Sequence, residues 1–194
     1  MGIEDLIYVE ENIMSAEALS SFIKWLNKMD QEFQKAGVVA PQTKEGQIIN
    51  EEKRKVKQFN LTLDSPSQTK VHWCNFFGKI IFDFKNRYEQ KIKTNCLIQT
   101  ISEINVLKYE NSGHYDFHTD HCYSIPRTLS VIILLNDDYK GGDLVFKDFN
   151  KNSELLRVQP SSARAIIWPS NFMYPHRVEP ITEGKRYSVV SWLL

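Results

Sequence analysis

Apolar side chains recur at helical spacing in two stretches of the N-terminal half. In the first, Ser15 can cap a helix whose apolar positions follow at intervals of three and four residues: Leu19, Phe22, Leu26 and Met29. In the second, the same spacing joins Phe77, Ile80, Phe84 and Tyr88. Each stripe covers one face of a helix, so the pattern predicts two amphipathic helices that pack into the core. LIYVEE (residues 6–11) is expected as a short strand before them.

A different pattern begins near residue 97. Short β-rich runs follow one another, separated by turn sequences such as NSG, DDYKGG and TEG. The runs read ISEINVLKYE, TLSVIILLN, DLVFKD, ELLRVQP, ARAIIWP and RYSVVSWLL. Many short strands with no helical pattern between them predict a sandwich or barrel. Two helices followed by such a region predict an α+β fold in which the helices pack against one sheet.

The change from helical to β-type hydrophobic pattern near residue 95 indicates a change of layer within one domain. A chain of 194 residues with 42% hydrophobic content can bury one sizeable core. We therefore expect a single domain over residues 1–194, with 1–95 as helical and strand support and 96–194 as the β core. Residues 34–58 are polar and weakly periodic. They suit a solvated connection, the commoner explanation, or a loop or mobile lid near an active site.

Charge and cysteine content exclude several classes of protein. Lysine plus arginine equals aspartate plus glutamate at 24 each, so no basic field favours nucleic acid. The three cysteines are widely spaced without a C-x-x-C pair, which argues against a disulfide framework and for a reducing compartment. The acidic N-terminal stretch does not resemble a signal peptide, and Leu6 stands where a myristoylation signal has Ser or Thr. We expect an intracellular, cytoplasmic protein with no membrane segment.

The stretch GHYDFHTDHCYS (residues 113–124) holds three of the five histidines of the chain. His118 and Asp120 are two positions apart, so at a strand end their side chains can aim at a common point. A third ligand must come from elsewhere, and His176 is the candidate. Two imidazoles and one carboxylate form the facial triad of non-haem Fe(II) oxygenases, which leaves coordination positions open. The H-x-D pair alone also occurs by chance as a surface salt-bridging pair.

Arg186 follows His176 by ten residues, after the turn Thr182-Glu183-Gly184. That turn can return the chain so that Arg186 enters the next strand beside the metal. A guanidinium is a planar fork that binds a carboxylate bidentately, as a bound dicarboxylate would require. Taken alone, Arg186 is more often a surface ion-pair residue.

Taken in order, these blocks resemble the Fe(II)- and 2-oxoglutarate-dependent dioxygenases, and above all their prolyl 4-hydroxylase-like branch, over residues 101–194. KYENSGHYDFHTDH is similar to the H-x-D lead-in of that branch, and RTLSVIILLN with GGDLVF to its arginine-led strand and Gly-Gly turn. QPSSARAIIWPS and HRVEPITEGKRYSVVSW are similar to its closing strands. The resemblance implies a double-stranded β-helix (jelly-roll) core with the N-terminal helices packed against one sheet.

The resemblance also implies roles for individual residues. His118, Asp120 and His176 would bind Fe(II) and form the catalytic centre. Arg186 would bind the distal carboxylate of 2-oxoglutarate, and Tyr109 would face this cosubstrate. Some relatives offer a second tyrosine to the distal carboxylate, two residues before the strand-ending Asn136. Leu134 stands there in this chain, which leaves serine, threonine or water as the neighbour of the guanidinium.

The activity implied is hydroxylation of an unactivated C–H bond with Fe(II), 2-oxoglutarate and O₂, releasing succinate and CO₂, with ascorbate as a further candidate cofactor. The likeness favours a prolyl residue in a peptide or protein substrate. A free amino acid or small metabolite stays open as substrate because one scaffold serves many chemistries. From other classes, a non-catalytic β-sandwich binding module and a cupin-like metal enzyme are the alternatives. Because ligation needs neutral imidazole, metal affinity should fall as pH drops through the histidine range.

Other polar and aromatic groups are expected outside the metal site. His121, one position beyond the H-x-D pair, should face the opposite side of the strand, and His114 should lie too far along it. Asp116 shares the ligand face by parity and is expected as a solvated carboxylate, with substrate contact or ligand orientation as alternatives. Trp168 and Trp192 lie in β runs and are expected in the core rather than at the substrate.

Overall fold

The computed structural model describes residues 2–40, 46–122 and 126–194. The helical elements are η1 (Ile3–Leu6), α1 (Ala16–Leu26), η2 (Asp30–Glu32) and α2 (Gln68–Ile92). The early strands are β1 (Tyr8–Glu10), β2 (Gln34–Lys35), β3 (Val38–Val39), β4 (Gln47–Ile48), β5 (Arg54–Lys55) and β6 (Lys57–Leu61). The later strands are β7 (Ile101–Glu110), β8 (His114–His118), β9 (Leu129–Leu134), β10 (Lys140–Gly141), β11 (Leu144–Lys147), β12 (Glu154–Val158), β13 (Ala165–Pro169), β14 (His176–Val178), β15 (Ile181–Glu183) and β16 (Lys185–Leu193).

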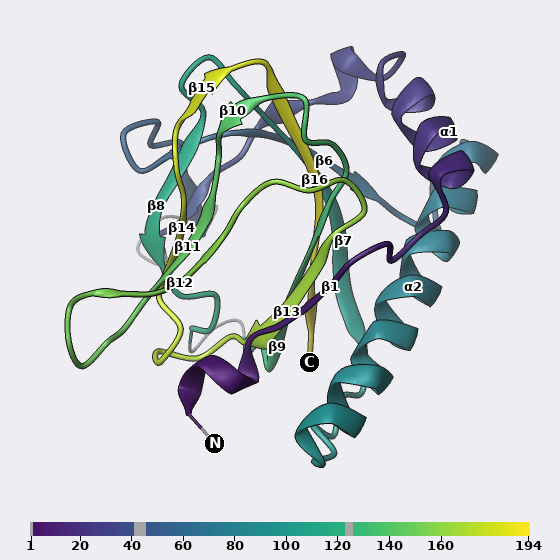
Figure 1. Ribbon diagram of the computed structural model, residues 1–194. Helices are drawn as coiled ribbons and strands as arrows, with labels where there is room; N and C mark the ends of the chain where they lie inside the picture. The colour runs from purple at the N-terminus through teal and green to yellow at the C-terminus, as the bar shows by residue number, and fades with distance from the viewer. Residues whose placement is uncertain (1, 41–45, 123–125) are drawn as a thin grey trace.

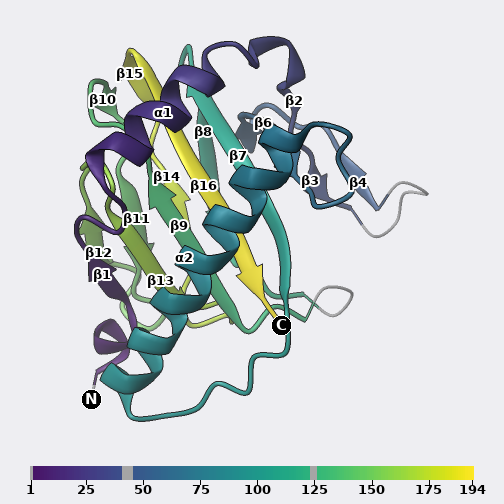
Figure 2. The ribbon, with the colours of Figure 1, turned by 90° about the vertical axis from the view of Figure 1, so that its right-hand side faces the viewer.

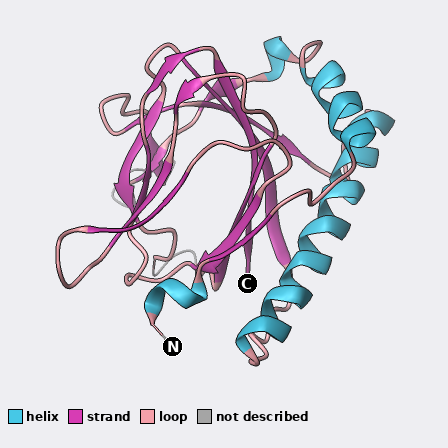
Figure 3. Cartoon of the chain, in the orientation of Figure 1, coloured by secondary structure: helices cyan, strands magenta, loops and turns pink. Residues whose placement is uncertain are grey.

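Two antiparallel sheets face each other across an apolar interior (Figure 1). The major sheet has seven strands in the order β1-β13-β9-β16-β7-β6-β2, and the minor sheet has five in the order β12-β11-β14-β8-β5. Their facing side chains form one buried cluster, which includes Leu144, Phe146, Trp168 and Val190. Figure 3 shows the strands gathered into this double layer and the two long helices to one side. This is the jelly-roll arrangement expected from the sequence.

Helices α1 and α2 cover the outer face of the major sheet (Figure 2). The Ser15 hydroxyl caps α1 by accepting a hydrogen bond from the amide of Ala18 at 3.2 Å, as predicted. The predicted apolar stripes supply the buried contacts with the sheet, and Phe22, Phe77 and Phe84 are fully buried. Helix α1 ends at Leu26, so Met29 packs from the following turn and not from the helix. None of the helices in the described part of the chain is long and apolar enough to span a membrane.

The polar segment 34–58 contains more strand than its sequence predicted. Strand β2 pairs with β6, β3 pairs with β4, and β5 pairs with β8. Residues 41–45 of the segment lie outside the described residues. Ladders of two residues give no hydrophobic periodicity, which explains why the pattern did not reveal them. Likewise, only Tyr8–Glu10 of LIYVEE is strand, because Ile3–Leu6 forms a 3₁₀ helix before it.

Candidate active site

The register of the minor sheet brings the two distant histidines together. Strands β8 and β14 pair so that His118 lies directly opposite His176. His118 is the last residue of β8, and Asp120 follows two positions later on the same side. One ligand atom from each of these three residues lies within 4.8 Å of the other two. Over residues 2–40, 46–122 and 126–194, this is the one group of three or more metal-type ligands.

Backbone carbonyls fix which nitrogen of each imidazole faces the cluster. Nδ1 of His118 lies 2.8 Å from the carbonyl oxygen of Asp116, and Nδ1 of His176 lies 3.0 Å from that of Tyr174. A carbonyl can only accept, so each Nδ1 must carry the proton and donate it. Each Nε2 therefore keeps its lone pair for a metal ion, and the carbonyls orient the rings as ligands require.

Asp120 is buried, and its two carboxylate oxygens have different neighbours. Oδ2 accepts a hydrogen bond from the Ser130 hydroxyl at 2.6 Å, and that hydroxyl lies 2.7 Å from the hydroxyl of Ser170. Oδ1 lies 3.7 Å from Nε2 of His118. Burial would raise the pKa of Asp120, but the two imidazoles and the Ser130 hydroxyl outweigh burial and lower it. The carboxylate is therefore ionised at neutral pH, and both of its oxygens face the cluster, since Oδ2 also lies 3.5 Å from Nε2 of His176.

His118 is held on its outer side by a stack of side chains. The ring of Tyr115 lies 3.5 Å from the His118 ring, centroid to centroid, with an interplanar angle of 15°. The guanidinium of Arg54 covers the other face of Tyr115, with Cζ 4.7 Å from the ring centroid. Burial and the neighbouring His176 lower the pKa of His118 to about 3, so this imidazole is neutral at neutral pH.

The cluster opens into a cavity of about 630 Å³ between the two sheets. Its deep walls come from inward-facing residues of the major sheet: Leu107, Tyr109, Ile132, Val190 and Trp192. Its mouth is lined by Gly37, Val39, Gly46, Gln47, Arg54 and Gln58. Described residues of segment 34–58 thus line the same cavity as the cluster. Of the two explanations for this segment, a loop near the site is therefore favoured over a solvated connection.

Considered without its neighbours, Arg186 was expected to form a surface ion pair. That expectation is wrong, because the residue is completely buried. Its Nη1 donates to the hydroxyl of Ser188 at 2.9 Å, and its Cζ lies 4.9 Å from the centroid of the Tyr109 ring. Its Nε and Nη2 have no hydrogen-bond partner. Within the described ranges no carboxylate lies within 4.0 Å of Arg186. A buried guanidinium without a counter-charge is costly, so this site favours an anion.

The donor groups present fit the iron and the dicarboxylate that the sequence resemblance implies. Two imidazoles and one ionised carboxylate are the ligand set of a facial triad, with further coordination positions left for other ligands. The unpaired N–H groups of Arg186 fit one end of a carboxylate. Tyr109 lies between the two regions: it lines the cavity and its ring packs against the guanidinium.

The other polar groups named from the sequence lie outside the cluster, as expected. His114 contacts the carbonyl oxygens of Ser112 and Glu52, and His121 contacts that of Arg127. Asp116 is exposed, and its carboxylate accepts a hydrogen bond from the amide of Phe117. Its contact with the cluster is made by its backbone carbonyl, which accepts from Nδ1 of His118.

The two tryptophans differ in environment. Trp168 is fully buried in the core, as expected. Trp192 is mostly buried but lines the cavity, with Cζ of Arg127 at 3.5 Å from its ring. Trp192 thus belongs to the buried core cluster, as expected, and it also forms part of the cavity wall.

Sequence reasoning missed several residues that contact the cluster or Arg186. Four of them lie on different strands (Ser130 on β9, Ser188 on β16, Tyr115 on β8 and Arg54 on β5), and Arg127 lies just before β9. They meet at the site only in the folded chain. The parity of β16 could have found Ser188, which lies two positions from Arg186 and so shares its face. The others carry no local motif.

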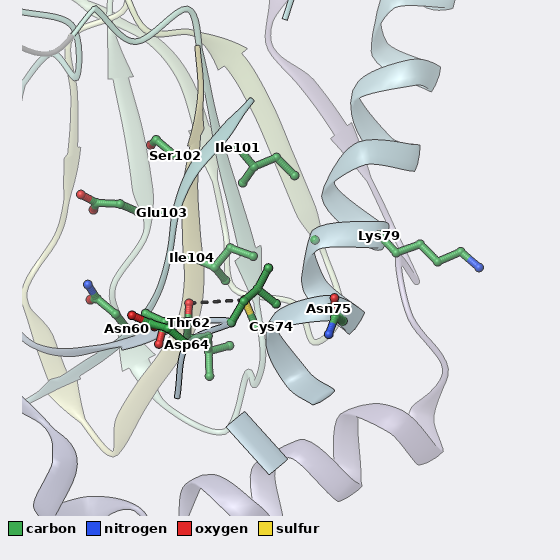
Figure 4. A pocket seen from close by; sticks show the side chains of 13 residues that line it. Asn60, Thr62, Asp64, Cys74, Asn75, Lys79, Ile101, Ser102, Glu103 and Ile104 are labelled. Atoms are coloured by element: carbon green, nitrogen blue, oxygen red, sulfur yellow. Dashed lines mark hydrogen bonds between the residues drawn. The ribbon is translucent and has the colours of Figure 1, made fainter. Parts of the chain in front are cut away.

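A second cavity, of about 550 Å³, is lined by residues of α2, β6 and β7 and of the segment after β6 (Figure 4). It is bounded by α2 and by the ends of β6 and β7, with Leu61, Cys74 and Ile104 on its apolar side. The Cys74 thiol points to the carbonyl of Leu61 at 3.5 Å, and burial raises its pKa. None of His118, Asp120 and His176 lines this cavity, so it is separate from the candidate site.

Comparison with known families matches the C-terminal half of the chain. Residues 104–194 match the family model described as the 2OG-Fe(II) oxygenase superfamily. Prolyl 3-hydroxylase 2 of Homo sapiens is 29% identical over 96 residues, which cover 42% of this chain and 14% of the relative. Prolyl 3-hydroxylase 3 of Homo sapiens is 34% identical over 82 residues, which cover 40% of this chain and 11% of the relative. The matches thus span only a small part of these curated relatives.

Solved structures share the whole fold. A prolyl hydroxylase from Trichoplax adhaerens, in complex with a peptide fragment of the hypoxia inducible factor oxygen degradation domain, aligns with a TM-score of 0.80. It is 16% identical, and the alignment covers 98% of this chain and 84% of that one. A prolyl-4-hydroxylase from Pseudomonas putida aligns with a TM-score of 0.74 at 17% identity, covering 98% and 96%. At this identity the likeness establishes the fold, which confirms the jelly roll.

Proposed function

We propose that this chain is an Fe(II)- and 2-oxoglutarate-dependent dioxygenase that hydroxylates a prolyl residue of a peptide or protein, because residues 104–194 match the family model of the 2OG-Fe(II) oxygenase superfamily. The observation that carries the proposal is the meeting of His118, Asp120 and His176 in one cavity with the buried, unpaired Arg186 behind it. A non-catalytic sandwich would have no reason to bury a guanidinium without a counter-charge.

In this proposal His118, Asp120 and His176 hold Fe(II), and Arg186 holds the distal carboxylate of 2-oxoglutarate, with Tyr109 packed beside it. When bound, the iron supplies the activation of O₂ that couples oxidative decarboxylation of 2-oxoglutarate to hydroxylation. The Asp116 and Tyr174 carbonyls keep both Nε2 lone pairs available. Ser130 orients the carboxylate of Asp120. The apolar walls contributed by Ile132 and Val190 exclude water from the reacting groups.

The peptide substrate is supported by the cavity mouth and by the relatives. The mouth is wide and is edged by backbone and polar side chains of segment 34–58, which an extended peptide can contact. The relatives named above are prolyl 3-hydroxylases, and the solved neighbours include a prolyl-4-hydroxylase and a peptide complex. The assay must therefore read hydroxylation at C3 and at C4 separately.

The remaining parts of the proposal concern the setting of the reaction. We propose that residues 1–194 act as one domain, because helices α1 and α2 share a core with the sheet that carries Arg186. We propose a cytoplasmic location, which the free thiols of Cys74 and Cys96 support. Ascorbate is proposed as a reductant that restores Fe(II), and adding it should prolong turnover in the assay below.

The test is an anaerobic titration with Fe(II) and 2-oxoglutarate, followed by a succinate assay against a panel of proline-containing peptides and free proline. The wild-type chain should bind both and release succinate with one peptide class. Asp120→Ala should lose metal binding and turnover. Asp116→Ala is the matched control, since its exposed carboxylate lies two residues away and outside the cluster. Full turnover by Asp120→Ala, or no 2-oxoglutarate binding by the wild-type chain, would reject the proposal.

A further inference from the structure

The turn between β9 and β10 places a second unpaired donor beside Arg186. Tyr139 lies at the end of this turn and is mostly buried, with 8% of its surface exposed. Its hydroxyl is shielded from solvent and has no hydrogen-bond partner. Buried hydroxyls without a partner are uncommon and each calls for an explanation. Burial raises the pKa of Tyr139, and the charge of the Arg186 guanidinium, together with its close approach to the phenol oxygen, offsets part of that rise. The phenol proton itself has no acceptor in the described chain.

Asn136 fixes this turn against the strand that carries Arg186. Its side-chain amide donates to the carbonyl of Lys185 at 2.7 Å, and its side-chain oxygen accepts from the amide of Tyr187 at 2.8 Å. These two contacts lie on either side of Arg186 in the chain. The position of the turn, and with it Tyr139, is therefore set relative to the guanidinium by hydrogen bonds and not by apolar packing alone.

Glycine at position 142 keeps the two side chains close. The backbone there has a φ of +72°, and a Cβ would lie 3.0 Å from Cε2 of Tyr139 and 3.1 Å from Cδ of Arg186. The tyrosine ring and the arginine side chain thus flank the same narrow gap. A side chain at this position would be strained and would push the two apart.

The orphan donors around this gap share one chemistry. Nε and Nη2 of Arg186 and the hydroxyl of Tyr139 can all donate, and none of them has an acceptor in the described chain. Three buried donors, two of them on one cationic guanidinium, fit an anion with two acceptor oxygens. Leu134, which pairs with Ser188 across β9 and β16, faces the same region but is apolar and cannot donate.

We propose that the Tyr139 hydroxyl donates to the distal carboxylate of 2-oxoglutarate together with Arg186, and so supplies the donor that Leu134 cannot. This inference rests on the proposed function. It makes Tyr139 a residue that determines affinity for the dicarboxylate, contributed by a turn and not by the sheet.

The test compares two 2-oxo acids by calorimetric titration of the Mn(II)-loaded chain. 2-Oxoglutarate has the distal carboxylate, and 2-oxopentanoate has the same carbon chain without it. Tyr139→Phe should weaken the binding of 2-oxoglutarate by about tenfold, since a hydrogen bond to a charged group is lost. It should leave the affinity for 2-oxopentanoate unchanged. Tyr187→Phe is the matched control, because this neighbour of Arg186 packs on the opposite face of β16.

A rescue variant separates a donor role from a packing role. A tyrosine at position 134 would be a diagonal neighbour of Arg186, because Leu134 lies opposite Ser188 in the register. Leu134→Tyr in the Tyr139→Phe background should restore part of the lost affinity for 2-oxoglutarate. Thermal unfolding of metal-free Tyr139→Phe should match the wild type or exceed it, since the substitution removes a hydroxyl without a partner.

The outcomes distinguish this inference from the proposed function. Unchanged affinity of Tyr139→Phe for 2-oxoglutarate, beside a wild-type chain that binds it, overturns the role of Tyr139 and leaves the proposed function in place. Equal weakening of both 2-oxo acids also overturns it, because the distal carboxylate would then not be the group contacted. A wild-type chain that binds 2-oxopentanoate but not 2-oxoglutarate overturns the proposed function itself.

Discussion

Each imidazole of the candidate iron site donates Nδ1–H to the backbone carbonyl two residues before it. This repeated contact sets the tautomer of His118 and His176 without a second side chain. Asp120 is different, because it depends on the hydroxyl of Ser130, which in turn contacts Ser170. The carboxylate is therefore the ligand whose orientation side-chain substitution can change.

Ser130→Ala tests that dependence. Loss of the hydrogen bond should weaken Fe(II) or Mn(II) binding by about 10- to 100-fold, the usual effect of removing a group that orients a ligand. Metal titration of the variant measures it, with Ser161→Ala as control because that hydroxyl binds Glu11 at the surface. Equal metal affinity in Ser130→Ala and the wild type would show that Asp120 is oriented by its backbone alone.

Protonation of His118 gives a prediction about pH. Its pKa is about 3 in the folded chain and about 6.5 when unfolded. Between these values only the unfolded chain binds the proton, so the free energy of unfolding decreases as pH falls, by at most about 1.4 kcal/mol per pH unit. Urea unfolding with a metal chelator should show a shallower pH dependence for His118→Asn below pH 6.5. Parallel curves for the two proteins would contradict the low pKa.

The sequence singled out those residues of the candidate site whose types and spacings are unusual. The H-x-D pair, His176 and Arg186 stand out because their residue types and spacings are unusual in a chain with five histidines. Ser130, Tyr115 and Tyr139 did not stand out, since each meets the site through register or a turn contact that no short motif encodes. The sequence showed that Leu134 stands where some relatives have a tyrosine. It did not show which residue contacts Arg186 instead, and the structure identifies that residue as Ser188.

At the scale of elements, α2 joins the helical layer to the major sheet. Its apolar stripe faces β6 and β7, while Phe82 on the opposite side is 54% exposed. Sequence periodicity predicted this helix because 25 residues give the 3.6-residue repeat many turns in which to appear. The two-residue strands of segment 34–58 gave no such repeat.

Phe77→Ala tests how much this layer contributes to stability. Phe77 is fully buried against α1 and the sheet, so truncation should lower the free energy of unfolding by about 3–5 kcal/mol. Phe82→Ala on the same helix is the matched control and should cost less than about 1 kcal/mol. Chemical denaturation measures both. Similar losses in the two variants would mean that α2 does not pack as described.

At the scale of the whole molecule, each of the two sheets contributes a different part of the candidate site. The major sheet carries Arg186, the minor sheet carries the two histidines, and the cavity lies between them. Strand number and turn spacing predicted a sandwich or barrel, and the family resemblance implied the jelly roll. Sequence analysis could not predict which strands neighbour each other, because pairing depends on contacts between residues far apart in the chain.

Ligand-dependent stability provides a test at this scale. Mn(II) should raise the melting temperature, and 2-oxoglutarate should raise it further only when Mn(II) is present. The shift reflects binding to the folded state alone, about 2.7 kcal/mol at a ligand concentration of 100 times Kd. Differential scanning fluorimetry measures it, with Asp120→Ala as the control that should lose both shifts. A 2-oxoglutarate shift without metal would contradict the shared site.

The opposition of His118 and His176 across β8 and β14 also has a consequence for the lifetime of the protein. An ion held by both imidazoles would cross-link two strands that are far apart in the sequence. Closing so long a loop would restrict the unfolded chain and so stabilise the folded one. Removal of iron would release that restraint and loosen the minor sheet first. If the site holds iron as proposed, the metal-free chain should therefore be cleaved by a protease faster than the iron-loaded chain, and first in the minor sheet.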